Sequence, residues 1–129
     1  MKELSDAYFV QTFIHKGRRE RLLSELNHPK KRYRALDRFC HQAEELLDPA
    51  KILCRGKKIT EEAVFTRLKQ QPCRILSPDG FLNERYETFE EAFRLVSMGT
   101  DAAIILLDGY AVVTEEAMKG ERGMYLMKE

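Results

Sequence analysis

The sequence lacks most of the features that would assign it quickly to a functional class. It contains no P-loop, GxGxxG, GxSxG or HExxH motif, which excludes the common nucleotide-binding, hydrolase and zinc-protease signatures. Three cysteines, Cys40, Cys54 and Cys73, form no CxxC pair and an odd number, so neither a disulfide framework nor a zinc site is indicated. We interpret all three as small structural residues. The sequence therefore indicates no catalytic residue, metal site or cofactor.

Long hydrophobic runs are also absent. The longest purely apolar run, Ala102 to Leu107, is far too short to span a bilayer, and the N-terminal MKELSDAYFVQTF lacks the apolar stretch of a signal peptide. With 43% hydrophobic and 33% charged residues, the composition is that of a globular protein. We expect a cytoplasmic protein without a membrane segment, and one domain over residues 1–129.

The net charge is only +1, but it is unevenly distributed along the chain. Residues 15–58 hold 13 Lys and Arg against 6 Asp and Glu, a net charge of +7. Residues 59–129 hold 8 against 13, a net charge of −5. The densest stretch, KGRRERLLSELNHPKKRYRALDRFCH over residues 16–41, has nine basic and three acidic residues. We therefore expect a basic helical part, about 1–71, and an acidic part with a sheet, about 72–129.

The basic part is predicted to be helical. Residues 5–14 are ambiguous between helix and strand, but helix is favoured because they lead into helical sequence and Ser5 or Asp6 could cap it. The leucines of 17–27 predict a further helix. A second helix is predicted over 29–47, from one buried stripe with spacings of three and four: Tyr33, Leu36, Cys40, Ala43 and Leu47. Asp48-Pro49 should end it. Residues 50–59 are expected to be a connector, and Thr60 to cap a third helix.

The acidic part has the signals of strands and turns. Cys73–Ser77 and Met124–Lys128 are predicted strands, and Thr88-x-x-Glu91 is a capping box that opens a helix ending at Gly99. Asp108-Gly109 separates two strand-like runs and predicts a type I′ hairpin. We predict an α+β fold, with a helical N-terminal half packed with a small, mostly antiparallel sheet and one covering helix.

The basic residues are the candidate binding site. On a helix over 29–47, Lys30, Arg34, Arg38 and His41 cluster opposite the apolar stripe, with Lys31 at the edge. Such a face suits phosphate contact, because Lys and Arg displace counterions from nucleic acid. The anion-binding candidates are Arg18, Arg19, Arg21, Lys30, Lys31, Arg34, Arg38 and His41. Asp37 and Glu45 share the face, so an ordinary solvated helix surface is an alternative.

Four further questions stay open. The basic half could face an acidic protein, or the acidic half of a second copy in a homodimer. A small phosphodiesterase or nuclease would need Asp37, Arg38 and His41, or Glu121 and Arg122, to converge in a cleft. The loop with Glu121 and Arg122 is either a simple connection or a mobile segment over a site. Arg19 shares the apolar helix face, so it lies at a frayed edge or is held by a carboxylate.

The stretches KGRRERLLSELNHPKKRYRALDRF and GERGMYLMKE together resemble a family of small uncharacterised bacterial proteins, with a KxRRER opening, a PKKR segment and a closing GER. Gly123 and Met124 depart from the ending of that pattern. The resemblance implies a bacterial source but no activity or cofactor. It also implies that Arg18 to Arg21, Lys30 to Arg32, and Glu121-Arg122 form one polar site.

Overall fold

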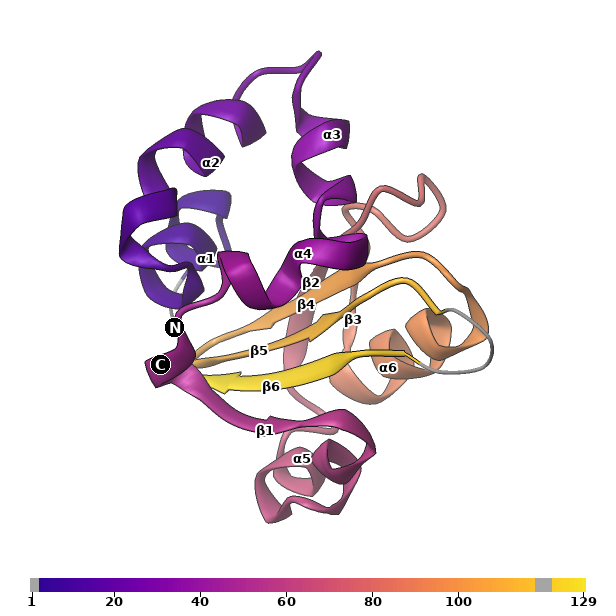
Figure 1. Ribbon diagram of the computed structural model, residues 1–129. Helices are drawn as coiled ribbons and strands as arrows, with labels where there is room; N and C mark the ends of the chain where they lie inside the picture. Colours follow the sequence, from indigo (N-terminus) through magenta and orange to yellow (C-terminus); the bar gives the residue numbers. More distant parts are fainter. Residues whose placement is uncertain (1–2, 118–121) are drawn as a thin grey trace.

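A six-stranded antiparallel sheet forms the centre of the computed structural model, which describes residues 3–117 and 122–129 (Figure 1). The strand order is β1-β6-β5-β4-β2-β3. The strands are β1 (Ile52–Arg55), β2 (Pro72–Leu76), β3 (Tyr86–Thr88), β4 (Ala103–Leu107), β5 (Tyr110–Thr114) and β6 (Met124–Lys128). Because β1 comes from the basic part and the other strands from the acidic part, the two parts share one sheet. The predicted α+β class is confirmed.

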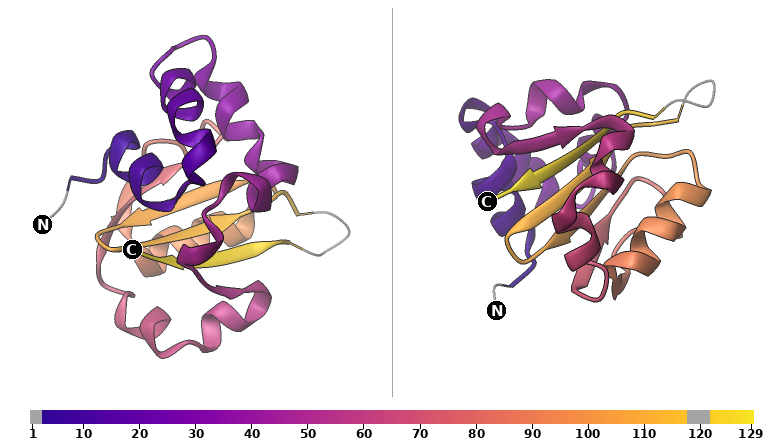
Figure 2. Two further views of the ribbon diagram at one scale, coloured as in Figure 1. Left: turned by 60° about the vertical axis from the view of Figure 1, so that its left-hand side comes forward. Right: turned by 90° about the horizontal axis from the view of Figure 1, so that it is seen from below.

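Helices cover both faces of the sheet (Figure 2). One face packs against α1 (Asp6–Phe13), α2 (Arg19–Leu26), α3 (Arg32–Asp37) and α4 (Phe39–Leu46), and the other against α5 (Ala63–Arg67) and α6 (Phe89–Met98). Alternate residues of each central strand enter opposite layers: Ile104 and Leu106 face α1–α4, whereas Ile105 faces α5 and α6. This is why all five residues of β4 are buried.

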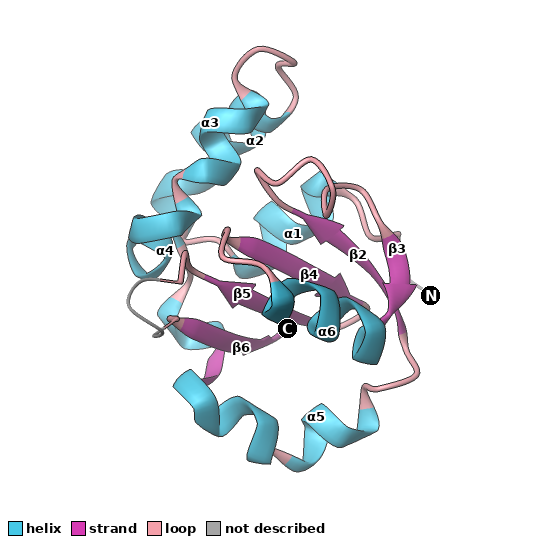
Figure 3. Ribbon diagram, turned by 90° about the vertical axis from the view of Figure 1, so that its right-hand side faces the viewer, coloured by secondary structure: helices cyan, strands magenta, loops and turns pink. Residues whose placement is uncertain are grey.

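Two of the helices project beyond the sheet. α2 and α3 lie side by side and extend past its edge, joined by a turn at residues 27–31 (Figure 3). Leu22 and Leu26 of α2 and Ala35 and Leu36 of α3 are buried, and together with α1 they form the base of this pair. We call residues 16–38 the basic hairpin.

The prediction of a single helix over 29–47 is wrong. The helical residues divide into α3 and α4 at Arg38, and Gln42 has non-helical dihedral angles (φ −120°, ψ 19°). Of the predicted stripe, Leu36, Cys40, Ala43 and Leu47 are buried, but Tyr33 is 60% exposed. The stripe is broken because α3 packs against α2 away from the sheet, whereas α4 packs on β5.

Other local predictions were wrong where the strands are short. The expected connector at 50–59 contains β1, and β3 was missed altogether. Thr60 caps no helix, because its hydroxyl donates to the carbonyl of Lys57 and α5 begins only at Ala63. The Asp108-Gly109 hairpin exists, but only Gly109 has a positive φ (83°), so the turn is not type I′.

The remaining predictions for the C-terminal half, and the helix at the N-terminus, are confirmed. The hydroxyl of Thr88 accepts the N–H of Glu91 at 3.3 Å and opens α6, which Gly99 ends. The predicted strands at 73–77 and 124–128 match β2 and β6 to within one residue. Helix α1 is also formed, with the hydroxyl of Ser5 accepting the N–H of Tyr8.

Candidate nucleic-acid interface

Basic side chains gather around two adjoining hollows on the basic hairpin. Arg21, Lys31 and Arg34 line the larger hollow, of about 620 Å³, and Arg18, Arg21 and Arg38 line the smaller, of about 230 Å³. The two hollows share Gly17, Arg21 and Glu25, so they are continuous. We call Arg18, Arg21, Lys31, Arg34 and Arg38 the basic surface. Five of the eight anion-binding candidates therefore lie on one face.

Glu25 lies at the centre of the basic surface. Its carboxylate accepts a hydrogen bond from the guanidinium of Arg38, and the guanidinium of Arg21 lies 3.7 Å from it. The Glu25 side chain is 18% exposed, whereas that of Arg21 is 80% exposed. Glu25 thus fixes Arg38 in place and leaves most of Arg21 in solvent.

The other cations of the basic surface have no internal partner. Within the described ranges, the side chains of Arg18, Lys31 and Arg34 form no ion pair or hydrogen bond, and all three are exposed. Elsewhere most arginines are paired: Arg55 with Glu44 at 3.0 Å and Arg94 with Glu91 at 2.9 Å are examples. Folding therefore neutralises much of the arginine charge, but leaves Arg18, Lys31 and Arg34 without a partner among the described residues.

The acidic half of the chain contributes little to the hairpin. In the part of the chain that the structure describes, two ion pairs join residues 15–58 to residues 59–129. They are Arg32–Glu84 at 2.8 Å and His41–Glu116 at 3.1 Å. Neither involves a residue of the basic surface.

The three remaining anion-binding candidates lie elsewhere. Arg19 turns inward, where its Nε donates to the carbonyl of Ile14 at 2.9 Å and its Nη2 lies 3.9 Å from Asp48. His41 pairs with Glu116 in a separate hollow, and Asp37 accepts from the thiol of Cys40 rather than from His41. Lys30 is exposed in the turn between α2 and α3, at the tip of the hairpin.

Arg122 holds the end of α6. Its guanidinium donates to the carbonyls of Val96 at 2.7 Å and of Gly99 at 2.6 Å. Both lie at the helix C-terminus, where the last carbonyls lack i+4 donors, and the carbonyl of Val96 also accepts the N–H of Gly99 at 3.2 Å. Desolvation lowers the pKa of Arg122. The second loop candidate, Glu121, lies outside the described residues.

A network of four charged side chains anchors the basic hairpin to the sheet. Arg74 of β2 donates to Glu84 at 2.7–3.0 Å and to Asp6 at 3.0 Å, and Arg32 of α3 contacts the same two carboxylates at 2.6 and 2.8 Å. Burial raises the pKa of Asp6, but the hydrogen bonds and charges of Arg32 and Arg74 outweigh it and hold that pKa below its ordinary value. Glu84 adopts the left-handed region (φ 67°), an uncommon conformation for a residue other than glycine.

Sequence reasoning missed Asp6, Arg74 and Glu84 as members of this network. The available signal was Arg74, a charged residue within the otherwise apolar strand CRIL, which implies buried partners. Arg32 was included only through the family resemblance.

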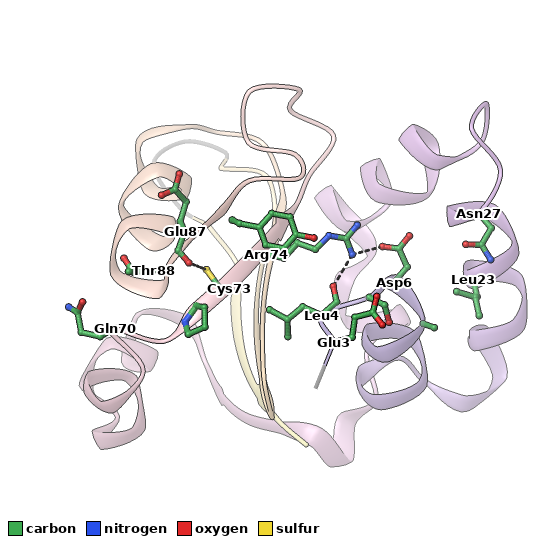
Figure 4. Close-up of a pocket in the computed structure, with 14 residues that line it drawn as sticks. Glu3, Leu4, Asp6, Leu23, Asn27, Gln70, Cys73, Arg74, Glu87 and Thr88 are labelled. Carbon is green, nitrogen blue, oxygen red and sulfur yellow. Dashed lines mark hydrogen bonds and ion pairs between the residues drawn. The ribbon is translucent and has the colours of Figure 1, made fainter. Parts of the chain in front are cut away.

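Beside this network lies a hollow of about 980 Å³, larger than the two hollows of the basic surface (Figure 4). It runs along the N-terminal segment, with Leu4 and Asp6 at its middle, Gln70 at one end and Asn27 at the other. Arg74 donates to the carbonyl of Leu4 at 2.9 Å, so its charge is fully engaged at this wall. The hollow has a size suited to a small ligand, but its cation is already neutralised.

The cysteines have no catalytic environment. Burial raises the pKa of the Cys40 thiol to about 11 and that of Cys73 to about 12, so both stay protonated near neutral pH. Desolvation also raises the pKa of Cys54. Across residues 3–117 and 122–129, no group of three or more His, Cys, Asp or Glu side chains could hold a metal ion.

The chain matches no protein-family model, no curated protein and no solved structure. The family resemblance noted in the sequence therefore remains an expectation. Among the described helices, none has the length and hydrophobicity needed to cross a bilayer.

Proposed function

We propose that this protein binds nucleic acid, using the basic surface of the hairpin to contact phosphates. The observation on which the proposal depends is the set of exposed cations, Arg18, Lys31 and Arg34, that fold onto one face without internal partners. Such cations are hydrated and available, so a phosphate backbone can be bound without breaking ion pairs within the protein.

The shape of the hairpin supports the same function. α2 and α3 project beyond the sheet (Figure 3), so the hairpin that carries the basic surface is accessible to a long polymer. The network of Arg32 with Asp6 and Glu84 fixes the N-terminal end of α3, which limits the ordering required on binding. Among the described residues, Glu20 and Glu25 are the acidic side chains that line the two hollows, and no histidine or aspartate lines them, so the proposal is binding rather than hydrolysis.

The test is fluorescence anisotropy of a labelled oligonucleotide over a series of salt concentrations. We expect affinity to fall steeply with salt, because each phosphate that a cation neutralises contributes about 0.9 to the slope of log K against log salt. Lys31→Gln/Arg34→Gln should weaken binding and reduce that slope by about two. These two residues are chosen because neither forms an internal contact whose loss would disturb the fold.

The matched control is Lys57→Gln/Lys58→Gln, which removes two exposed cations from a 3₁₀ helix beyond β1. It should leave the slope nearly unchanged. Absence of salt-dependent binding, or an equal loss in the control, would reject the proposal. The basic hairpin would then be better explained as a surface for an acidic protein or for the acidic half of a second copy.

A further inference from the structure

One exposed aromatic ring lies on the hairpin, and a second lies on the turn between β2 and β3 that is ion-paired to the hairpin. Tyr33, on α3 between Arg32 and Arg34, is 60% exposed. Within the described residues, its side chain makes no hydrogen bond, ring contact or ion pair. A large aromatic side chain left in water among cations is available to a ligand that has both negative charge and a flat apolar surface.

The second ring is held outward by a well-ordered turn. Phe81, in the connection between β2 and β3, is 63% exposed, while the adjacent Leu82 is 1% exposed. The side chain of Asp79 accepts the N–H of Phe81 at 2.8 Å, and Nε of Arg85 donates to its carbonyl at 2.7 Å. The backbone of the turn is thus fixed in a way that buries Leu82 and exposes Phe81.

A cation accompanies this ring as well. The guanidinium carbon of Arg85 lies 4.1 Å from the centroid of the Phe81 ring, a cation–π arrangement. The turn also reaches the hairpin directly, through the ion pair of Glu84 with Arg32 at 2.8 Å. Tyr33 follows Arg32 in the chain, and Phe81 precedes Glu84 by three residues, so one ion pair joins the segments that hold the two rings.

We propose that the basic surface binds single-stranded nucleic acid, with Tyr33 and Phe81 stacking on unpaired bases. This inference rests on the proposed function and specifies its substrate. A duplex would offer its phosphates to the cations equally well. In a duplex, however, the bases are stacked on each other and their faces are hidden. Exposed aromatic rings add affinity only where base faces are free, and such stacking tolerates any sequence.

The experiment compares a labelled oligothymidylate with the same strand annealed to oligodeoxyadenylate, by fluorescence anisotropy at one salt concentration. We expect the single strand to bind at least tenfold more tightly. Tyr33→Leu and Phe81→Leu should each weaken binding of the single strand roughly fivefold or more, because they remove a ring but keep an apolar side chain. Neither should change binding of the duplex.

Two controls separate stacking from general disturbance. Tyr33→Phe keeps the ring and should bind like the unmodified protein. Leu53→Ala removes an exposed apolar side chain from β1, at the opposite edge of the sheet from β3, and should also leave binding unchanged. Tyr33 and Phe81 are exposed, so their variants should fold, and circular dichroism will verify this.

The outcomes distinguish the inference from the proposed function. If neither strand form binds, the proposed function itself fails. If the duplex binds as tightly as the single strand and Lys31→Gln/Arg34→Gln weakens it, the function stands and the single-strand inference is overturned. Binding of the single strand that is unaffected by both leucine variants would also overturn it, because the rings would then make no contact with the bases.

Discussion

Arg74 shows how one residue connects distant parts of the chain. It lies in β2 among apolar neighbours, and its guanidinium is satisfied by the carbonyl of Leu4 and by the carboxylates of Asp6 and Glu84. A buried guanidinium without such partners would be strongly destabilising. The uncommon left-handed conformation of Glu84 places its carboxylate where both Arg74 and Arg32 can reach it. At the scale of single residues, this network is the most specific feature of the molecule.

Replacement of Asp6 with Asn should show the electrostatic contribution of the network. Asp6→Asn should lower the free energy of unfolding at neutral pH by about 1–3 kcal/mol, because two guanidinium groups lose a charged acceptor. In the native protein the pKa of Asp6 lies below its ordinary value of roughly 3.9. Its contribution is therefore complete above that pH and is lost as the pH falls through the native pKa.

Urea denaturation between neutral pH and the acid limit of folding would check this. The difference between the unmodified protein and Asp6→Asn should be constant down to about pH 5 and then shrink. Glu3→Gln, which removes a nearby exposed carboxylate without a partner among the described residues, is the control. A difference that persists unchanged into acid would mean that the Asp6 charge does not stabilise the fold.

The helices differ in how far their own sequence defines them. Thr88 provides both the sequence signal and the observed cap of α6, and α6 has the expected length. Thr60 carries a similar signal, with Glu61 and Glu62 behind it, but the chain forms a 3₁₀ helix there and the cap is not used. At the scale of elements, a capping signal alone therefore does not fix where a helix begins, because α5 starts only at Ala63 although Val64 and Phe65 behind it are buried.

The two threonines form a matched pair for mutation. Thr88→Ala should lower the free energy of unfolding by about 1 kcal/mol, because the N–H of Glu91 loses its acceptor. Thr60→Ala should change it by less than about 0.5 kcal/mol, as expected for an exposed hydroxyl outside a cap. Urea denaturation followed by circular dichroism measures both, and equal losses would show that capping does not account for the role of Thr88.

The sequence predicted elements that local signals define, and failed where distant contacts decide. The Asp108-Gly109 hairpin and the strand at 124–128 were found from neighbouring residues alone. β1 and β3 were missed because they are short, partly exposed edge strands that exist through pairing with β6 and β2. The break at Arg38 was missed because the apolar spacing continues through it, and only the docking of α4 on β5 sets the new direction.

The residues of the candidate site also divide into those that local sequence indicates and those that depend on distant contacts. Arg18, Arg21, Lys31 and Arg34 were identified from the dense charge of one segment, since neighbours in sequence stay neighbours on a helical hairpin. The exposure of Tyr33 could not be predicted, because it depends on the projection of α3 beyond the sheet. Phe81 is linked to the hairpin only through the ion pair between Glu84 and Arg32, which are 52 residues apart in sequence.

At the scale of the whole molecule, the sheet divides the core into two layers. Phe9 and Phe13 lie in the layer with α1–α4, whereas Phe65 and Phe89 lie in the layer with α5 and α6. Both layers pack on the same strands, and β1 joins the N-terminal half to β6 near the C-terminus. We therefore expect the layers to depend on each other and to unfold together.

Substitutions in each layer test this. Phe9→Leu and Phe89→Leu, both at fully buried positions, should each lower the free energy of unfolding by roughly 1–2 kcal/mol. Each should shift a single unfolding transition that circular dichroism and tyrosine fluorescence report at the same denaturant concentration. Tyrosine fluorescence is usable because the protein has no tryptophan. Two separated transitions, with Phe9→Leu moving only one of them, would mean that the layers fold independently.

The position of Glu25 gives the basic surface a further property. Its carboxylate is a counterion that belongs to the protein, since it neutralises Arg38 and lies near Arg21 before any ligand arrives. In the proposed complex, a phosphate beside Arg38 meets a cation whose charge is already balanced, so fewer ions are displaced than the five basic side chains would suggest. The hairpin would thus hold a strand less firmly than its arginine content implies.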